Sequence, residues 1–358
     1  MTVKQLYFQH FRSFPEYDLR LADTTLLVGR NGSGKTSIAE GLYLLSHGES
    51  FRAGKIDEMI AFEQELARVG ARLVDGEGDD EADILEITLT RGKVQGKRAH
   101  KRLYSVNGTK KMHKNFIGRF SAVVFQPADM RLVEGSPNRR RSFIDSILQL
   151  TNRDYSQSLN TYNQALKRYN SFLEQVREGN QPKSVLQYWE LMMAKHGEIV
   201  QETRHDFFEF LREMSTPFDF DVRYQISKIS QSDLESRRDR AIAAGHTLVG
   251  PHKDDFEVLF AGEKLENREL SAYGSRGQQR LGVLWLKLGE LKFLEDQQQQ
   301  KPFLILDDIF SELDEKSEKL VLQLVGKYQT ILTTANEDTQ QFLEEKLKDL
   351  KTIKMNGS

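Results

Sequence analysis

The first 30 residues alternate between apolar and polar positions as β-strands do. The apolar members of this alternation are Leu6, Phe8, Tyr17, Leu19 and Leu21. A mainly apolar run at 25–28 then predicts a further strand. It leads into a glycine-rich segment, after which a helix is expected at about 36–45.

The strand pattern continues after the first helix and returns near the end of the chain. Strands are predicted at 66–74, 84–89 and 120–125. The dipeptide Asn107–Gly108 has the composition of a tight hairpin turn. Beyond residue 245 the predicted elements are a strand at 256–260, a helix at 279–294, a strand at 303–306, a helix at 315–325 and a strand at 330–334.

The middle of the chain has the period of amphipathic helices. Its first apolar seam consists of Tyr155, Leu159, Tyr162, Leu166, Tyr169 and Leu173, at spacings of 4 and 3. A polar break with Gly179 and Pro182 follows, and a second helical pattern covers about 185–214. Two long helices with a short connector predict an antiparallel hairpin. An alternating strand is expected next, at about 218–226.

The order of these patterns indicates one α/β nucleotide-binding fold that is interrupted by an insertion. We expect an α/β domain formed by residues 1–130 together with 246–358. Residues 131–245 are expected to form an inserted, mostly helical lobe with an antiparallel helical hairpin and short strands.

Composition narrows the classes of protein that this chain can be. Its 358 residues suit two domains, or one domain with a large insertion. The formal net charge is −2, so overall charge points to no particular partner. Cysteine is absent, which excludes disulfides and cysteine nucleophiles and fits a cytoplasmic protein. Apolar runs stay below the roughly 18 residues of a membrane span, so no membrane association is expected.

The glycine-rich segment fits the P-loop pattern. It reads Gly29-Arg30-Asn31-Gly32-Ser33-Gly34-Lys35-Thr36. Its glycines allow successive backbone N–H groups to turn toward phosphate oxygens. Lys35 is predicted to reach the β- and γ-phosphates of ATP, and Thr36 to ligate Mg²⁺. The alternative is a glycine-rich turn that caps a helix, but the strand before it and the helix after it favour the P-loop.

An acidic pair ends the buried strand at 303–306. Asp307 and Asp308 follow its four apolar residues directly. Parallel strands deliver such carboxylates to the edge of the sheet where phosphates bind. Asp307 is predicted to hold Mg²⁺ through water, and Asp308 to orient or activate the attacking water. The alternative is an acid pair that caps the next helix.

A third motif opens the helix expected near 279. The segment Ser275-Arg276-Gly277-Gln278 is similar to the Ser-Gly-Gly-Gln signature of ABC-type ATPases, with arginine at the first glycine. Ser275, Gly277 and Gln278 are therefore candidates to meet a γ-phosphate at the positive end of a helix. Residues 311–314 follow Asp308 in the manner of a D-loop. In this class the signature of one subunit completes the nucleotide site of the other, so an ATP-dependent homodimer is implied.

The chain also resembles one family within that class, the RecF family of bacterial recombination mediators. The matching segments are Phe11-Arg12-Ser13-Phe14, Ser136-Pro137 with Arg139 to Asp145, Thr247 to Asp255, and Tyr273 to Arg280. They extend over nearly the whole chain. Two departures are Lys253, where the family usually has arginine, and Ala128, where it usually has an acid.

The resemblance adds candidate residues to the nucleotide site. Arg12 is expected near the nucleotide, as its counterpart in similar ATPases is. Gln126 is a candidate for the Q-loop residue that senses Mg²⁺, and the alternative is a polar residue at a strand end. The switch histidine of transporter ATPases is missing after Thr334, where Ala335 and Asn336 stand. Asn336 or Thr334 is a candidate substitute.

Two basic clusters are candidates for contact with DNA. The first contains Lys97, Arg98, Lys110 and Lys111, and the second contains Arg139, Arg140 and Arg141. Such residues bind phosphates with salt-dependent affinity and without sequence preference. The alternatives are a solvated face for the first cluster and salt bridges within the helical lobe for the second.

The resemblance implies an ATP-dependent DNA-binding protein of recombinational repair. It implies ATP-driven dimerisation, slow ATP hydrolysis, and binding to single-stranded, gapped or junction DNA. It also implies cooperation with RecO and RecR in loading recombinase. The alternatives are the ATP-binding subunit of a transporter, an SMC-type structural or nuclease-associated ATPase, and a small-molecule kinase. The missing switch histidine, the short helical hairpin and the signature motif argue against these three in turn.

Overall fold

The computed structural model describes residues 1–75, 82–262 and 267–355 of the chain. The chain folds into two compact units, one formed by residues 1–129 and 290–358 and the other by residues 130–289. The chain returns from the second unit to the first at residues 289/290. The sequence analysis places the end of the inserted lobe earlier, at 245/246. The physical reason is that β12 (Asp255–Phe260) pairs along its length with β11 (Phe220–Gln225). The division into an ATPase domain and an inserted lobe stays a prediction.

A parallel sheet in the first unit provides the edge at which the acidic motif lies. Its strands run in the order β10 (Ala122–Phe125), β13 (Phe303–Asp307), β14 (Thr330–Thr334), β3 (Thr24–Val28) and β15 (Leu350–Lys354). Every neighbouring pair is parallel, so the carboxyl ends of the strands share one edge. The strands predicted at 25–28, 303–306 and 330–334 are confirmed.

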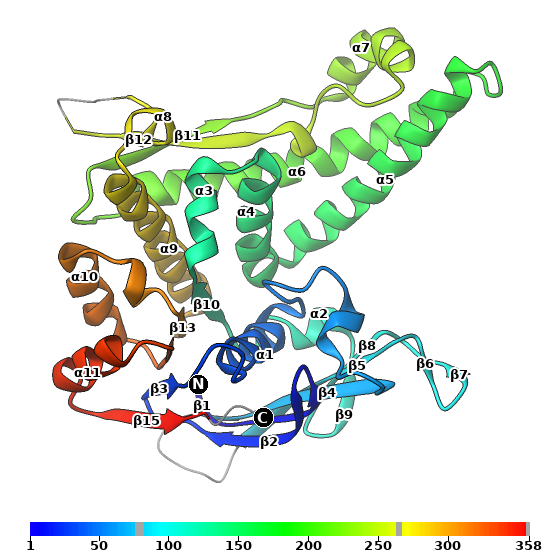
Figure 1. Cartoon of the computed structure of the whole chain (residues 1–358). Helices are drawn as coiled ribbons and strands as arrows, with labels where there is room; N and C mark the ends of the chain where they lie inside the picture. Colours follow the sequence, from blue (N-terminus) through cyan, green and yellow to red (C-terminus); the bar gives the residue numbers. More distant parts are fainter. Residues whose placement is uncertain (76–81, 263–266, 356–358) are drawn as a thin grey trace. The chain divides into compact units, whose positions relative to one another are not determined.

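An antiparallel sheet forms a second layer of the same unit. Its strands run in the order β2 (Phe14–Arg20), β1 (Thr2–Phe11), β4 (Leu66–Val74), β5 (Ala82–Thr90), β8 (Arg102–Val106) and β9 (Thr109–Lys111). β8 pairs with β9 across Asn107–Gly108, as predicted. Helix α1 (Lys35–His47), blue in Figure 1, contacts strands of both sheets. Its apolar residues therefore cover more than one face, because it lies between two layers.

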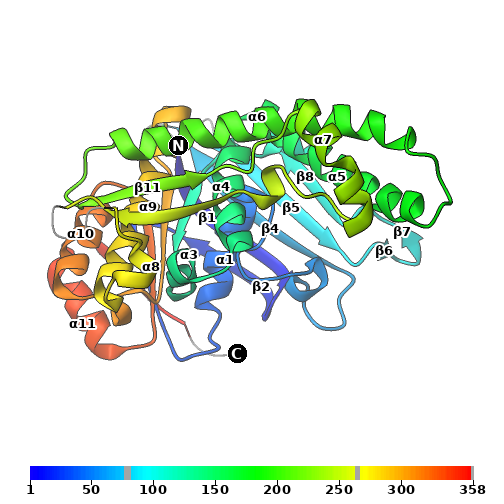
Figure 2. The same cartoon turned by 90° about the horizontal axis from the view of Figure 1, so that it is seen from above.

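The second unit contains the predicted helical hairpin. Helices α5 (Arg153–Arg177) and α6 (Val185–Glu213) run antiparallel and side by side (Figures 1 and 2). Near their connector, the rings of Phe172 and Trp189 stack with centroids 6.2 Å apart. The other helices of this unit are α3 (Arg131–Glu134), α4 (Pro137–Thr151), α7 (Gln231–Ala244), α8 (Leu270–Tyr273) and the first part of α9 (Arg276–Gln298).

Among the longer elements, sequence reasoning missed α7, α11 (Glu337–Lys346) and β15, and it gave no bounds for α4. Helix α7 buries Leu234 and Ala241, so it has no continuous apolar stripe that a periodicity search detects. Helix α10 (Glu315–Val325) lies where it was predicted. The shorter elements are η1 (Ile56–Met59), β6 (Lys93–Val94), β7 (Lys97–Arg98), α2 (His113–Phe116), η2 (Pro127–Met130), η3 (Pro251–Lys253) and η4 (Phe310–Glu312). In the part of the chain that is described, no helix is long and apolar enough to cross a bilayer.

Candidate nucleotide site

The predicted P-loop turns between β3 and α1. Gly32 and Gly34 have φ angles of 86° and 95°, in the left-handed region that favours glycine. A Cβ atom on Gly34 would lie 2.4 Å from the ring of Phe14. Both the backbone and the packing therefore require glycine at residue 34, directly before the first turn of α1. The free N–H groups of that turn are suited to bind an anion.

Lys35 places a buried cation at this turn, and Ser33 places an unpaired hydroxyl group there. Lys35 is 7% exposed, and its Nζ donates to the carbonyl oxygens of Gly29 at 2.7 Å and Arg30 at 3.0 Å. Burial lowers the pKa of Lys35, although the carboxylates of Asp308 and Asp307 oppose this shift. Ser33 Oγ is buried and has no hydrogen-bond partner among the described residues. A buried cation and an unpaired hydroxyl at a helix start fit phosphate oxygens.

Asp307 is held by two threonine hydroxyl groups. Its Oδ1 accepts hydrogen bonds from Thr36 Oγ1 at 3.1 Å and from Thr333 Oγ1 at 2.7 Å. Burial raises the pKa of Asp307 and the charge of Asp308 adds to this, while the two hydroxyl groups oppose it. A carboxylate and a hydroxyl oxygen are hard ligands that Mg²⁺ accepts. Thr36 and Asp307 therefore fit the predicted magnesium site.

Asp308 has a strained backbone next to this pair. Its φ angle is 54°, which is uncommon for a residue other than glycine. Its N–H donates to Thr333 Oγ1 at 3.1 Å and to the carbonyl oxygen of Thr333 at 3.3 Å. Backbone strain of this kind is found at functional sites that the surrounding structure holds in place. Thr333 thus fixes both members of the acidic pair.

A cavity of about 550 Å³ brings the two motifs together. It is lined by Arg12, Ser13, Asn31, Gly32, Gly34, Lys35, Thr36, Ser37, Arg52, Glu58, Ile60, Phe62, Asp308 and Thr333. Its volume is within the range of small-molecule sites. The segments that meet here lie far apart in the sequence, since the P-loop and the acidic pair are separated by most of the chain.

Arg12 lines this cavity with its guanidinium already paired. Its Nε and Nη2 donate to the two carboxylate oxygens of Glu40 at 2.8 and 2.6 Å, and its Nη1 donates to the carbonyl oxygen of Glu58 at 2.5 Å. Glu40 is fully buried on α1. The sequence analysis did not select Glu40. A signal was present, because an acid that stands within an apolar helix needs a partner.

Gln126 lies at the same edge of the sheet as Asp307. It directly follows Phe125, which pairs with Leu306 in the parallel register of β10 and β13. Its N–H donates to Asp129 Oδ2 at 3.0 Å, so it begins a tight turn. Its position suits a residue that senses a metal ion at the strand ends, and that role stays a prediction.

The two candidate substitutes for the switch histidine, Asn336 and Thr334, make hydrogen bonds at the N-terminal end of α11. Asn336 caps that helix, and its Oδ1 accepts from the N–H group of Asp338 at 2.7 Å. Thr334 Oγ1 accepts from the N–H group of Asn336 at 3.1 Å. The residue that reaches the acidic pair is their neighbour Thr333. The sequence analysis missed it because strand alternation does not reveal which neighbouring strand a hydroxyl meets.

The signature segment forms a capping box at the start of α9. The N–H of Ser275 donates to Gln278 Oε1 at 2.9 Å, and the N–H of Gln278 donates to Ser275 Oγ at 3.3 Å. Ser275 is exposed. These residues and Gly277 belong to the second unit.

Two of the three arginines at 139–141 already bind groups within the protein. Nε and Nη2 of Arg140 donate to the two carboxylate oxygens of Asp255 at 2.6 and 2.7 Å. Nη1 of Arg141 donates to the carbonyl oxygen of Asp254 at 2.7 Å. Arg139 is exposed. Within this cluster, the geometry favours the salt-bridge alternative for Arg140.

The other basic cluster lies on short strands. Lys97 and Arg98 form β7, which pairs with β6 in a small hairpin, and both side chains are exposed. Lys110 and Lys111 lie on β9, at one edge of the antiparallel sheet. Their role in DNA binding stays a prediction.

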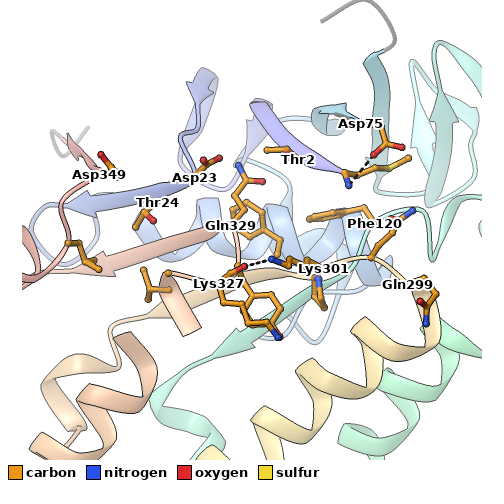
Figure 3. A pocket seen from close by; sticks show the side chains of 18 of the residues that line it. Thr2, Asp23, Thr24, Asp75, Phe120, Gln299, Lys301, Lys327, Gln329 and Asp349 are labelled. Carbon is orange, nitrogen blue, oxygen red and sulfur yellow. Dashed lines mark hydrogen bonds and ion pairs between the residues drawn. The ribbon is translucent and has the colours of Figure 1, made fainter. Parts of the chain in front are cut away.

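A second cavity, of about 700 Å³, lies at the opposite edge of the parallel sheet (Figure 3). Thr24 and Phe303 line it at the starts of β3 and β13. Lys301 Nζ donates to the carbonyl oxygen of Lys327 at 3.1 Å, as drawn in Figure 3. Among the described residues that line it, none belongs to the P-loop or to the acidic pair. The nucleotide chemistry is therefore assigned to the carboxyl edge.

Comparison with known proteins agrees with this geometry. The sequence model of the RecF/RecN/SMC N-terminal domain matches residues 2–356. The chain belongs to this family. Within the RecF/RecN/SMC family it is 29% identical over 379 residues to the DNA replication and repair protein RecF of Bacillus cereus, covering 99% of this chain and 96% of that protein. It is 28% identical over 364 residues to the RecF protein of Caldanaerobacter subterraneus subsp. tengcongensis, covering 95% and 96%.

Solved structures of this family have the same fold. A structure of the recombination mediator protein RecF-ATPrS in the RecFOR pathway has a TM-score of 0.85 and 25% identity, covering 99% of this chain and 96% of that chain. The Smc head domain from Pyrococcus furiosus has a TM-score of 0.51 and 17% identity, covering 99% and 94%, and shows the fold alone. The resemblance to RecF and the ABC-type α/β fold expected from the sequence are confirmed.

Proposed function

We propose that this chain is an ATP-dependent DNA-binding protein of recombinational repair. The observation that supports this most directly is the cavity that Lys35, Thr36 and Asp308 line together, with Asp307 hydrogen-bonded to Thr36. The proteins similar to it along nearly their whole length are named for DNA replication and repair, and one solved relative is named as a complex with ATP.

The residues of the cavity divide the work of binding and hydrolysis. Lys35, Ser33 and the first N–H groups of α1 hold the phosphate tail. Thr36 and Asp307 hold Mg²⁺, which when bound neutralises phosphate charge and orients the tail. Asp308 has an accessible carboxylate at the cavity, where it orients the attacking water and accepts its proton.

We further propose that ATP closes a homodimer through the signature segment. Ser275 is exposed at the N-terminal end of the 23-residue helix α9, and a helix start attracts an anion. In the dimer, Ser275, Gly277 and Gln278 of one copy meet the γ-phosphate held by the other. Hydrolysis then opens the dimer, so the ATPase acts as a timer.

DNA is the partner that this cycle controls. Exposed Arg139, Lys97 and Arg98 bind the phosphates of gapped, single-stranded or double-stranded DNA without reading the sequence. RecO and RecR are the protein partners through which recombinase is loaded. This part of the proposal rests on the resemblance to RecF and on the charge of these exposed side chains.

The first test is the oligomeric state of the full chain, measured by sizing with and without ATP and then with gapped DNA. We expect a dimer with ATP and a complex with DNA that depends on ATP. Lys35→Met is expected to abolish nucleotide binding and both changes. An exposed lysine outside both basic clusters gives the control, and Lys346→Met is expected to change neither. Wild-type protein that stays monomeric with ATP and ignores gapped DNA would overturn the proposal.

The second test addresses the shared site. Lys35→Met protein alone and Ser275→Arg protein alone are each expected to be inactive. A heterodimer of the two has one site with both defects and one intact site, so it should recover part of the ATPase activity. Ser275→Arg protein that dimerises and hydrolyses ATP normally would contradict the shared site, whatever the mixture does.

A further inference from the structure

Phe62 is a large apolar residue that lines the nucleotide cavity. It is 90% exposed and lines the cavity together with Ile60, which is 4% exposed. A single exposed apolar residue needs no explanation by itself. Its location in the nucleotide cavity and the rigidity of its loop indicate a role in ligand binding.

The backbone on both sides of Phe62 is fixed. Ile60 forms a β-bridge with Phe11, and the N–H of Ala61 donates to the carbonyl oxygen of His10 at 2.7 Å. Glu63 has a φ angle of 64°, so the chain turns sharply directly after Phe62. The turn is closed by a hydrogen bond from the N–H of Gln64 to the carbonyl oxygen of Ala61 at 3.1 Å.

Arg91 fastens this turn from a neighbouring segment. Its Nε donates to the carbonyl oxygen of Gln64 at 2.8 Å. Its two Nη atoms make longer contacts, of 3.3 to 3.4 Å, to the carbonyl oxygens of Asp57, Ile60 and Ala61. One guanidinium thus serves four carbonyl groups of a single loop. Because the backbone at Phe62 is already fixed, binding a ligand to its side chain costs little additional conformational entropy.

The cavity has two chemically different parts. The P-loop and Lys35 form a part suited to anions, whereas Ile60 and Phe62 form an apolar part. Among the described residues that line the cavity, Phe62 carries the only aromatic ring. A nucleotide has the same two parts, an anionic tail and a planar aromatic base.

We propose that Phe62 is the residue on which the nucleotide base stacks. The proposal rests on the nucleotide-binding function proposed above, because the phosphate tail must lie at the P-loop for its base to reach Phe62. Stacking on an aromatic ring holds any base, and holds a purine more strongly because of its larger face. Arg91 is then a positioning residue that acts through the turn.

Affinity for ATP and for inorganic triphosphate separates base binding from phosphate binding. The full chain is titrated with each ligand and Mg²⁺ at a protein concentration at which sizing shows a monomer. Phe62→Ala is expected to weaken ATP binding roughly 5- to 100-fold and to leave triphosphate binding unchanged. Phe62→Trp should keep or improve the affinity for ATP. A matched control is Met112→Ala, because Met112 is 61% exposed and lies outside this cavity.

The outcomes distinguish the two proposals. If wild-type protein binds neither ligand, the nucleotide-binding function fails. If it binds both and Phe62→Ala leaves the ratio of the two affinities unchanged, the stacking role is wrong. An effect of Phe62→Ala that appears only when the protein dimerises, or only with DNA, assigns the ring to those contacts and also overturns the proposal. Arg91→Lys keeps the positive charge but loses the planar guanidinium that reaches several carbonyl oxygens at once. It should therefore weaken binding of ATP but not of triphosphate, and by less than Phe62→Ala does.

Discussion

The hydroxyl group of Thr333 donates a 2.7 Å hydrogen bond to Oδ1 of Asp307. Oγ1 of Thr333 in turn accepts a hydrogen bond from the N–H group of Asp308 at 3.1 Å. One side chain on β14 therefore orients both acids at the end of β13. In parallel register Thr333 stands directly beside Asp307, so the strand pairing itself creates this contact.

Thr333→Val is expected to slow ATP hydrolysis while keeping the fold. Valine has nearly the same shape, but it neither donates to Asp307 nor accepts from Asp308. Each such hydrogen bond contributes about 1 kcal/mol or less, so losing both corresponds to about 1–2 kcal/mol, or roughly a 5- to 30-fold lower kcat. Steady-state ATPase rates and a urea titration test this. A variant with unchanged kcat would show that Thr333 only fills space.

Asp308→Asn is expected to bind ATP and hydrolyse it very slowly. The amide keeps the shape of the side chain and loses the carboxylate that positions and deprotonates water, an effect of about 10²- to 10⁴-fold. The ATP-bound dimer should persist for longer, which single-turnover hydrolysis and sizing measure together. Normal turnover would move the catalytic role to another acid, and Glu312 is the next candidate by sequence.

Arg139 and Arg140 are expected to respond differently to alanine. Arg140 has a side chain 13% exposed and paired with Asp255, so its loss should lower the free energy of unfolding by about 1–3 kcal/mol. Arg139→Ala should leave stability within about 0.5 kcal/mol. It should weaken DNA binding for all sequences and reduce the salt slope by about one unit. Urea titrations and DNA titrations at several salt concentrations test both. An unchanged salt slope for Arg139→Ala would move DNA binding to the cluster at Lys97 and Lys110.

His252 is expected to make the protein less stable in mild acid. Burial, together with the charges of Lys253 and Arg141, lowers the pKa of His252 to about 4, and its Nδ1 lies 2.7 Å from the hydroxyl of Tyr162. The unfolded histidine titrates near 6.5. Between these values the unfolded state binds more protons, so the free energy of unfolding falls as pH decreases from about 6.5 to 4.

The contribution of His252 to this loss is about 3 kcal/mol, and it is complete only below about pH 4. Urea titrations at several pH values between 4.5 and 7.5 measure it, and other groups contribute to the wild-type slope. His252→Gln removes the titration, so its slope should be shallower. Equal slopes for the two proteins would contradict the prediction.

Local patterns of apolar and polar residues predicted most of the secondary structure. Helix α5 was predicted from the seam of Tyr155 to Leu173 because each apolar residue lies one turn from the next. Strand β13 was predicted because it is apolar at every position except its last. Helix α7 gave no such signal, and the edge strand β15 alternates too weakly. Both are held by packing partners that lie elsewhere in the chain.

The sequence by itself determined the fold class and the chemical groups at the phosphate end of the site. Lys35, Thr36 and the acidic pair lie in short motifs whose spacing specifies their chemistry. The tertiary structure decided which groups support them. Arg12 meets Glu40 28 residues away, and Arg140 meets Asp255 115 residues away. Periodicity reveals that a side chain is buried, but its partner depends on which segments the fold brings together. The fold likewise brings Phe62 to the cavity of the P-loop.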